Sequence, residues 1–200
     1  MVGHTLAGSN WLNEGRISFT RLRVFDVPQS AFKQNVAEEL GMNGGPTDPF
    51  AFGLPYFLVT NYSTVTDDPS LPQVQRDNTW GLSDAVSLTR GRHNLRFGFD
   101  WVHFQFNFLQ SQSVRGRYTY TGAYTGNGVD SNTGDALADF LLGYPQDTQR
   151  TVGSAQAYLR QNIYSGYVQD DWRIAPRLTL NLGLRYEYAD PFSDANDQLF

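Results

Sequence analysis

The chain of 200 residues contains no cysteine, and this absence excludes several classes of site at once. Without a thiol there is no disulfide framework, no thiolate nucleophile and no zinc site built on cysteine. No apolar run reaches the roughly 18 residues that a membrane-spanning helix needs. The first residues lack a basic segment followed by an apolar one, so we expect no signal peptide in this chain.

Basic charge is also scarce. The formal net charge is -5, and no run of lysine or arginine occurs anywhere in the chain. Binding to phosphate backbones needs a basic face, so nucleic acid is not an expected partner.

Aromatic residues, in contrast, are plentiful. The chain has 14 Phe, 11 Tyr and 4 Trp but only 2 Met. Aromatic side chains are enriched in strands, which makes β-sheet the first expectation.

Residues 178–188 alternate strictly between two kinds of side chain. Every even position is Leu or Tyr, and the odd positions are Thr, Asn, Gly, Arg and Glu. This period of two predicts a strand, and its length fits the roughly 9–11 residues that cross a bilayer as a tilted strand. One face would meet lipid and the other water. The expected lipid-facing residues are Leu178, Leu180, Leu182, Leu184 and Tyr186 here, and Leu95, Phe97 and Phe99 in the segment 93–101.

Similar alternation predicts further strands at 11–25, 78–89, 93–101 and 164–174, about six strands or strand pieces in all. The tight turns fall near residues 8, 91 and 176, whereas the connections 26–73 and 123–149 are long. Short and long connections therefore alternate, as in outer-membrane barrels. Short helices are expected at 31–40 and from Asp135, the latter ended by Gly143.

Five charged residues lie on the faces opposite the apolar rows. A polar inner wall is common to all barrels, so the simplest interpretation is that these side chains pair with one another along the wall. The functional interpretation is that they contact a plug or a substrate. These lumen-facing candidates are Arg96, Asp100, Asp171, Arg185 and Glu187.

No pattern indicates catalysis, a metal or a cofactor. Asp170 and Asp171 are adjacent in a predicted strand, so their side chains point to opposite faces and cannot act together as acid and base. His4, His93 and His103 lack metal-ligand spacing and suit a membrane rim or girdle. We therefore expect no enzyme.

Several segments together resemble the barrel of Oar-like TonB-dependent transporters. They are SLTRGRHNLRFG at 87–98, ALADFLLG at 136–143, YVQDDWR at 167–173 and PRLTLNLGLRYE at 176–187. The similarity covers most of residues 11–190.

This resemblance implies an all-β, antiparallel transmembrane barrel segment in the outer membrane of a double-membraned bacterium. In such transporters a carboxypeptidase-regulatory-like domain and a plug precede a barrel of about 22 strands. We expect residues 1–200 to be a partial barrel without the signal peptide, regulatory-like domain, TonB box or plug. The implied partners are outer-membrane lipid, the plug, an unidentified extracellular substrate and the TonB complex, which is reached through the N-terminal region.

Two other functions remain open. A passive porin-type channel would share the barrel but have no plug. A surface β-sandwich that binds carbohydrate would instead place Leu180, Leu182 and Leu184 in a protein core.

Overall fold

The computed structural model describes residues 1–64, 66, 68–128, 130, 133–153 and 156–197. The chain forms two compact units. The first comprises Met1–Arg23, Arg76–Asn107 and Ala157–Phe200, and the second comprises Val24–Gln75 and Phe108–Gln156. Among the described residues, no helix is both long enough and apolar enough to cross a membrane.

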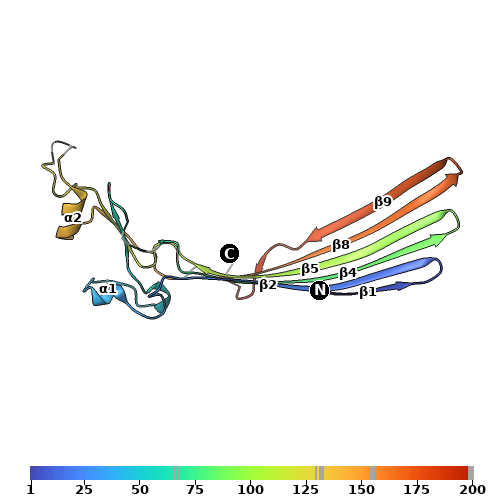
Figure 1. Cartoon of the computed structure of the whole chain (residues 1–200), viewed down its shortest axis with the longest axis horizontal. Helices are drawn as coiled ribbons and strands as arrows, with labels where there is room; N and C mark the ends of the chain where they lie inside the picture. Colours follow the sequence, from blue (N-terminus) through green and yellow to red (C-terminus); the bar gives the residue numbers. More distant parts are fainter. Residues whose placement is uncertain (65, 67, 129, 131–132, 154–155, 198–200) are drawn as a thin grey trace. The chain divides into compact units, whose positions relative to one another are not determined.

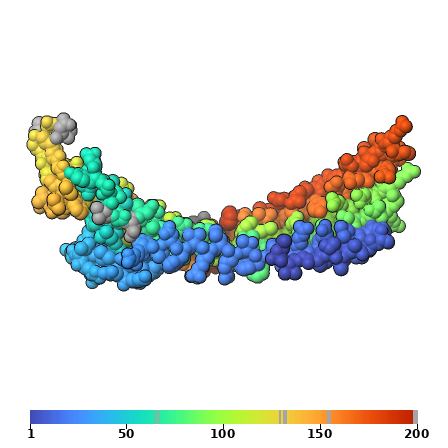
Figure 2. All heavy atoms as spheres, in the orientation of Figure 1, coloured from blue at the N-terminus to red at the C-terminus, as the bar shows by residue number. Residues whose placement is uncertain are grey.

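The first unit is built on a seven-stranded sheet, whose long strands run side by side in Figure 1 and whose heavy atoms Figure 2 draws in the same orientation. The strand order is β1-β2-β4-β5-β8, and both β9 and β10 pair with β8. The pairs β1–β2, β8–β9 and β8–β10 are antiparallel. The sheet is not closed: β1 lies at one edge, and β9 and β10 lie beside β8 at the other. The strands are β1 (Val2–Ala7), β2 (Trp11–Asp26), β4 (Gln73–Arg90), β5 (His93–Gln110), β8 (Gln156–Ala175), β9 (Leu178–Ala189) and β10 (Ser193–Asp194).

The three tight turns lie at one end of this sheet, as predicted (Figure 1). They join β1 to β2, β4 to β5 and β8 to β9. Gly91 has a φ of 61°, a conformation that glycine adopts without steric cost. The alternation therefore predicted β2, β4, β5, β8 and β9 and the end of the sheet at which the tight turns lie.

The strands are longer than the sequence pattern predicts. β5 continues to Gln110 and β8 begins at Gln156, well beyond the predicted 93–101 and 164–174. The alternation of apolar and polar residues is lost in these extensions, and the aromatic residues of β5 change parity there. Backbone pairing with neighbouring strands carries the ladder past the region where one face is apolar.

The second unit contains a smaller sheet and the short helices. Its strand order is β3-β6-β7, with β3 parallel to β6 and β6 antiparallel to β7. The elements are β3 (Tyr56–Val59), β6 (Arg117–Tyr120), β7 (Asp147–Gln149), α1 (Val36–Glu39), the 3-10 helix η1 (Pro49–Ala51) and α2 (Ala136–Leu142). Strands of three or four residues carry too little alternation to be predicted.

Helix α2 matches its prediction, whereas α1 is shorter than predicted. Asp135 Oδ1 accepts hydrogen bonds from the N–H groups of Leu137 and Ala138, and Gly143 ends α2 with a φ of 74°. The prediction of a helix over 31–40 was wrong at its start. Phe32 has a φ of 62°, which no α-helix accommodates.

Hydrophobic clusters among the described residues lie in the second unit. One joins Val59, Tyr120 and Ala136, and the other joins Phe50, Ala51 and Val114. The sheet of the first unit instead leaves many of its large apolar side chains exposed.

Candidate functional site

One face of the large sheet presents rows of exposed apolar side chains. Across β8 and β9, Val168 lies opposite Leu184 and Trp172 opposite Leu180, so these rows share a face. The exposed fraction is 39% for Leu180, 53% for Leu182 and 71% for Leu184. A sandwich would have placed these three leucines in a core, and here they are in none.

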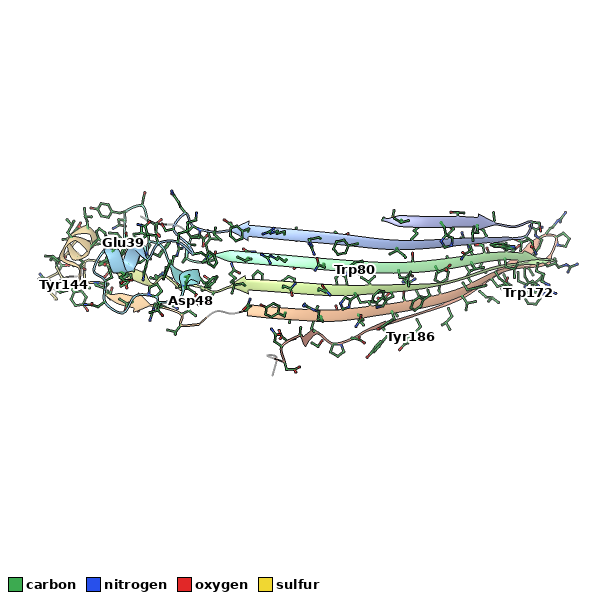
Figure 3. The ribbon with its side chains drawn as sticks, turned by 90° about the horizontal axis from the view of Figure 1, so that it is seen from below. Glu39, Asp48, Trp80, Tyr144, Trp172 and Tyr186 are labelled. Carbon is green, nitrogen blue, oxygen red and sulfur yellow. The ribbon has the colours of Figure 1, made fainter. Side chains whose placement is uncertain are left out.

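The other residues predicted to face lipid have similar exposure. Leu95 is half-buried, and the rest are exposed, namely Phe97, Phe99, Leu178 and Tyr186. Figure 3 shows the side chain of Tyr186 projecting from β9. The apolar face also extends to β2 and β4, where the rings of Phe19 and Trp80 lie 4.4 Å apart.

A continuous hydrogen-bonded network borders the apolar face toward the loop end of the strands. Arg21 Nε donates to Asn78 Oδ1 at 2.8 Å, and Asn78 Nδ2 donates to Gln105 Oε1 at 3.0 Å. Gln105 contacts His103, whose Nδ1 lies 2.9 Å from Asn162 Oδ1. The border network ends where Asn162 Nδ2 donates to Asp190 Oδ2 at 3.1 Å. Its members are Arg21, Asn78, Gln105, His103, Asn162 and Asp190.

A second polar cluster borders the same face at the turn end. His93 Nδ1 lies 2.7 Å from Asp170 Oδ2, and the His93 ring stacks on that of Trp172 at 5.3 Å between centroids. Asp170 lies opposite Leu182, within the apolar rows. Figure 3 shows Trp172 at the turn end of the sheet.

The separation of the two borders matches the thickness of a membrane. Along β5 they are marked by His93 and His103, with Leu95, Phe97 and Phe99 between them. Ten residues at about 3.4 Å each, tilted by about 45°, rise roughly 24 Å, close to the apolar band of about 25 Å on outer-membrane barrels.

The opposite face is polar and joins three of the five lumen-facing candidates. Ser165, only 5% exposed, donates its hydroxyl to Asp100 Oδ2 at 3.2 Å. Arg185 Nη2 donates to Ser165 Oγ at 3.0 Å and to Glu187 Oε2 at 3.3 Å. Arg185 Nη1 also lies 4.0 Å from Asp100 Oδ2. Asp100, Ser165, Arg185 and Glu187 thus form one network, the wall network.

The remaining two candidates lie apart from the wall network. Arg96 Nε donates to Ser87 Oγ at 3.3 Å, on the neighbouring strand. Asp171 accepts from Gln169 at 3.3 Å and lines a hollow together with Arg92 and Arg173.

The second unit contains a buried carboxylate. Asp139 has no exposed surface, and its oxygens accept from the N–H groups of Thr125 at 2.9 Å and Tyr124 at 3.3 Å. Burial alone would raise the pKa of Asp139, but the hydrogen bonds from the segment Gly122–Thr125 outweigh it and hold the pKa below its ordinary value. The ionised side chain therefore ties α2 to that segment.

An exposed apolar patch lies beside this carboxylate. Leu141, Leu142 and Tyr144 are 76%, 60% and 58% exposed, and the ring of Tyr124 lies 6.1 Å from that of Tyr144. The neighbouring Phe140 instead packs on Phe57 and Tyr120. Tyr124, Leu141, Leu142 and Tyr144 are the loop patch.

No group of three or more His, Asp or Glu side chains in the described part of the chain could hold a metal ion.

Sequence reasoning missed Ser165 and most of the border network. The sequence did contain a signal for the border network. Asn78 has the same parity as the apolar Trp80 on its strand, and Arg21 has the same parity as the apolar Phe19 on its strand.

A family model described as "Outer membrane beta barrel domain" matches residues 2–200. No curated protein and no solved structure matches the chain.

Proposed function

This chain belongs to the outer membrane β-barrel domain family, and we propose that it forms part of the wall of a TonB-dependent active transporter. Membership places it in the outer membrane of a Gram-negative bacterium. The transport proposal goes further, and it is supported by the resemblance of residues 87–98, 136–143 and 167–187 to Oar-like transporters.

The observation that carries the proposal is the folded second unit. Its two hydrophobic clusters and the buried Asp139 make the long connections an ordered structure. An ordered loop structure suits the capture of a specific ligand. The loop patch offers apolar and aromatic contacts to the extracellular substrate.

In this mechanism the chain binds and guides, and it performs no chemical step. Substrate binds the second unit, and the plug lies against the polar face of the sheet. Pulling by the TonB complex then moves the plug and opens the path. The wall network supports this role because Arg185 forms ion pairs with both Asp100 and Glu187. Polar groups on the plug surface can replace these ion pairs with hydrogen bonds of their own when the plug binds.

Energy dependence is the test. The full-length protein would be produced in a host with and without functional TonB, and substrate accumulation from a library of labelled iron chelates, oligosaccharides and peptides would be measured. We expect accumulation of one class only with TonB and only in energised cells. Uptake that is equal in both hosts and scales with solute size would establish a passive channel instead.

A further inference from the structure

A polar cluster interrupts the apolar face of the large sheet across β1, β2 and β4. Asn13 Nδ2 donates a hydrogen bond to Asp84 Oδ1, and His4 Nε2 lies 2.9 Å from Asn13 Oδ1. The imidazole ring covers Gly15, its register partner on β2, where any larger side chain would collide with the ring. His4, Asn13 and Asp84 are the mid-face cluster.

The mid-face cluster lies in the middle of the apolar band and not at one of its borders. Asp84 has the same parity as Trp80 and Leu82, and the side chains of all three are exposed. Asp84 is six residues from Asn78 of the border network and six from Arg90, the last residue of β4. A carboxylate therefore lies halfway along the apolar part of this strand.

Lipid cannot satisfy this cluster. Asp84 Oδ1 accepts from Asn13, but Oδ2 has no hydrogen-bond partner in the part of the chain that the structure describes. Hydrocarbon offers no donor, and a charged side chain that faces lipid at this depth is destabilising. Ionisable groups within the membrane pair with protein groups instead. His4, for which the sequence favours a rim, thus lies with Asp84 at a place that suits contact with protein.

The mid-face cluster is complementary to a second copy of itself. Asn13 donates its amide N–H to Asp84, so its Oδ1 accepts from His4 Nε2 and leaves His4 Nδ1 free among the described residues. A protonated imidazole and the carboxylate Oδ2 then present a donor and an acceptor of opposite charge on one face. A two-fold axis along the membrane normal, passing between these groups, brings the donor of each copy to the acceptor of the other and makes two equivalent contacts.

We propose that the face of β1, β2 and β4 around the mid-face cluster binds a second copy of this protein within the membrane. His4 of each copy donates to Asp84 of the other. The exposed apolar side chains around the cluster pack between the copies, namely Ile17, Phe19, Trp80 and Leu82. The inference rests on the lipid-facing orientation of this face, and not on whether transport requires energy.

Photo-crosslinking in the outer membrane tests this contact. The full-length protein would carry benzoylphenylalanine in place of Ile17, whose side chain is 59% exposed beside the cluster, and the cells would be irradiated. Benzoylphenylalanine in place of Leu184, on the same face at the far edge of the sheet, is the matched control. We expect a covalent dimer of this protein from position 17 and none from position 184. Absence of a dimer at position 17, equal dimer from both positions, or a crosslink from position 17 to a different protein would overturn the proposal.

Two variants together distinguish a contact between copies from a contact within one copy. His4→Ala and Asp84→Asn each remove one partner from both intermolecular hydrogen bonds. A hydrogen bond between charged groups contributes about tenfold to affinity, so each variant alone should dimerise about a hundredfold more weakly than the unaltered protein. A mixed dimer keeps one complete pair, because the Asp84→Asn copy retains His4 and the His4→Ala copy retains Asp84.

Native mass spectrometry of the two full-length variants, one with a mass tag, measures this in mild detergent. We expect mixed dimers about tenfold in excess of their random proportion. Mixed dimers at the random proportion, or an Asp84→Asn protein that dimerises as well as the unaltered one, count against the contact. Glu14→Gln is the matched control, since it removes a carboxylate from the opposite face of β2 and should leave the dimer intact. Crosslinking from position 17, with His4 and Asp84 unaltered, stands even where a variant assembles poorly.

The irradiated samples also separate failure of this proposal from failure of the orientation. Lipid adducts at position 184, with no dimer at position 17, remove only the contact between copies. If positions 17 and 184 both crosslinked within one chain and neither to lipid, the lipid-facing orientation would be removed as well.

Discussion

Gly98 on β5 makes room for an aromatic ring on the next strand. A Cβ at Gly98 would lie 2.6 Å from Cε1 of Tyr167, whereas a Cβ at Gly183 would meet only ordinary contacts, the nearest at 3.5 Å. Gly98→Ala should therefore displace the ring and destabilise the protein by about 1–3 kcal/mol. The temperature at which the folded band converts to the unfolded band in gel electrophoresis measures this. Gly183→Ala serves as control, and equal midpoints for the two variants would show that the contact is unimportant.

Asp139 gives the second unit a defined response to acid. Its pKa is lowered in the folded protein, so the stabilisation by its ionised form is complete above the ordinary value of 3.8 and is lost as the pH falls through the lowered value. At neutral pH, Asp139→Asn should increase cleavage of residues 122–146 by an added protease several-fold.

Acid should remove this difference. Below the lowered pKa of Asp139, the unaltered protein and Asp139→Asn should be cleaved at similar rates by an acid-active protease. A difference that persists unchanged into strong acid would mean that the charge of Asp139 is not what orders the segment.

At the scale of the elements, Phe140 is the aromatic side chain through which α2 packs on the small sheet. The Phe140 ring lies 5.2 Å from that of Tyr120 and 5.6 Å from that of Phe57, so it joins α2 to β6 and β3. Phe140→Ala should destabilise the second unit by an amount near the lower end of about 3–5 kcal/mol, because Phe140 is only half-buried. Leu141→Ala, at a position 76% exposed, should change stability by less than about 0.5 kcal/mol.

Hydrogen exchange over residues 117–142 measures both variants. Faster exchange for Phe140→Ala alone is the expected result. If Leu141→Ala accelerated exchange equally, the exposed residue would be part of a contact that holds α2.

Elements differ in how far their sequence predicts them. Residues 178–188 were predicted almost to the residue, because period two specifies both strand and face. The caps of α2 were predicted because Asp135 and Gly143 act locally. The sheet of β3, β6 and β7 was not predicted, since its short strands pair with strands distant in sequence and depend on packing around Tyr120: Tyr56 pairs with Arg117, and Thr119 with Asp147.

The wall network shows the same limit at the site. Asp100, Arg185 and Glu187 were predicted to face one side, but the pattern could not place Ser165 between them. That placement depends on the register of β5 against β8, which no tight turn fixes. The turn at Gly91, in contrast, fixes the register of β4 against β5. The pairing of Asn78 with Gln105 could therefore have been predicted from the sequence.

For the whole molecule, we expect the two polar borders to set the depth at which the sheet lies in the membrane. Asn78 and Leu82 share one face of β4, so parity alone gives them the same surroundings. The border network nevertheless places Asn78 at the outer edge of the apolar band and Leu82 within it. If so, the depth of each residue in the membrane should decide whether water reaches position 78 or position 82.

Single cysteines at positions 78 and 82 of the full-length protein, treated in intact cells with a membrane-impermeant maleimide, test this depth. Position 78 should react and position 82 should stay protected until detergent dissolves the membrane. Because both side chains project from the same face, a difference between them cannot arise from lumen access. Equal reactivity of the two before detergent would mean that the border network does not mark the membrane surface, and the apolar band would have to be placed elsewhere on the strands.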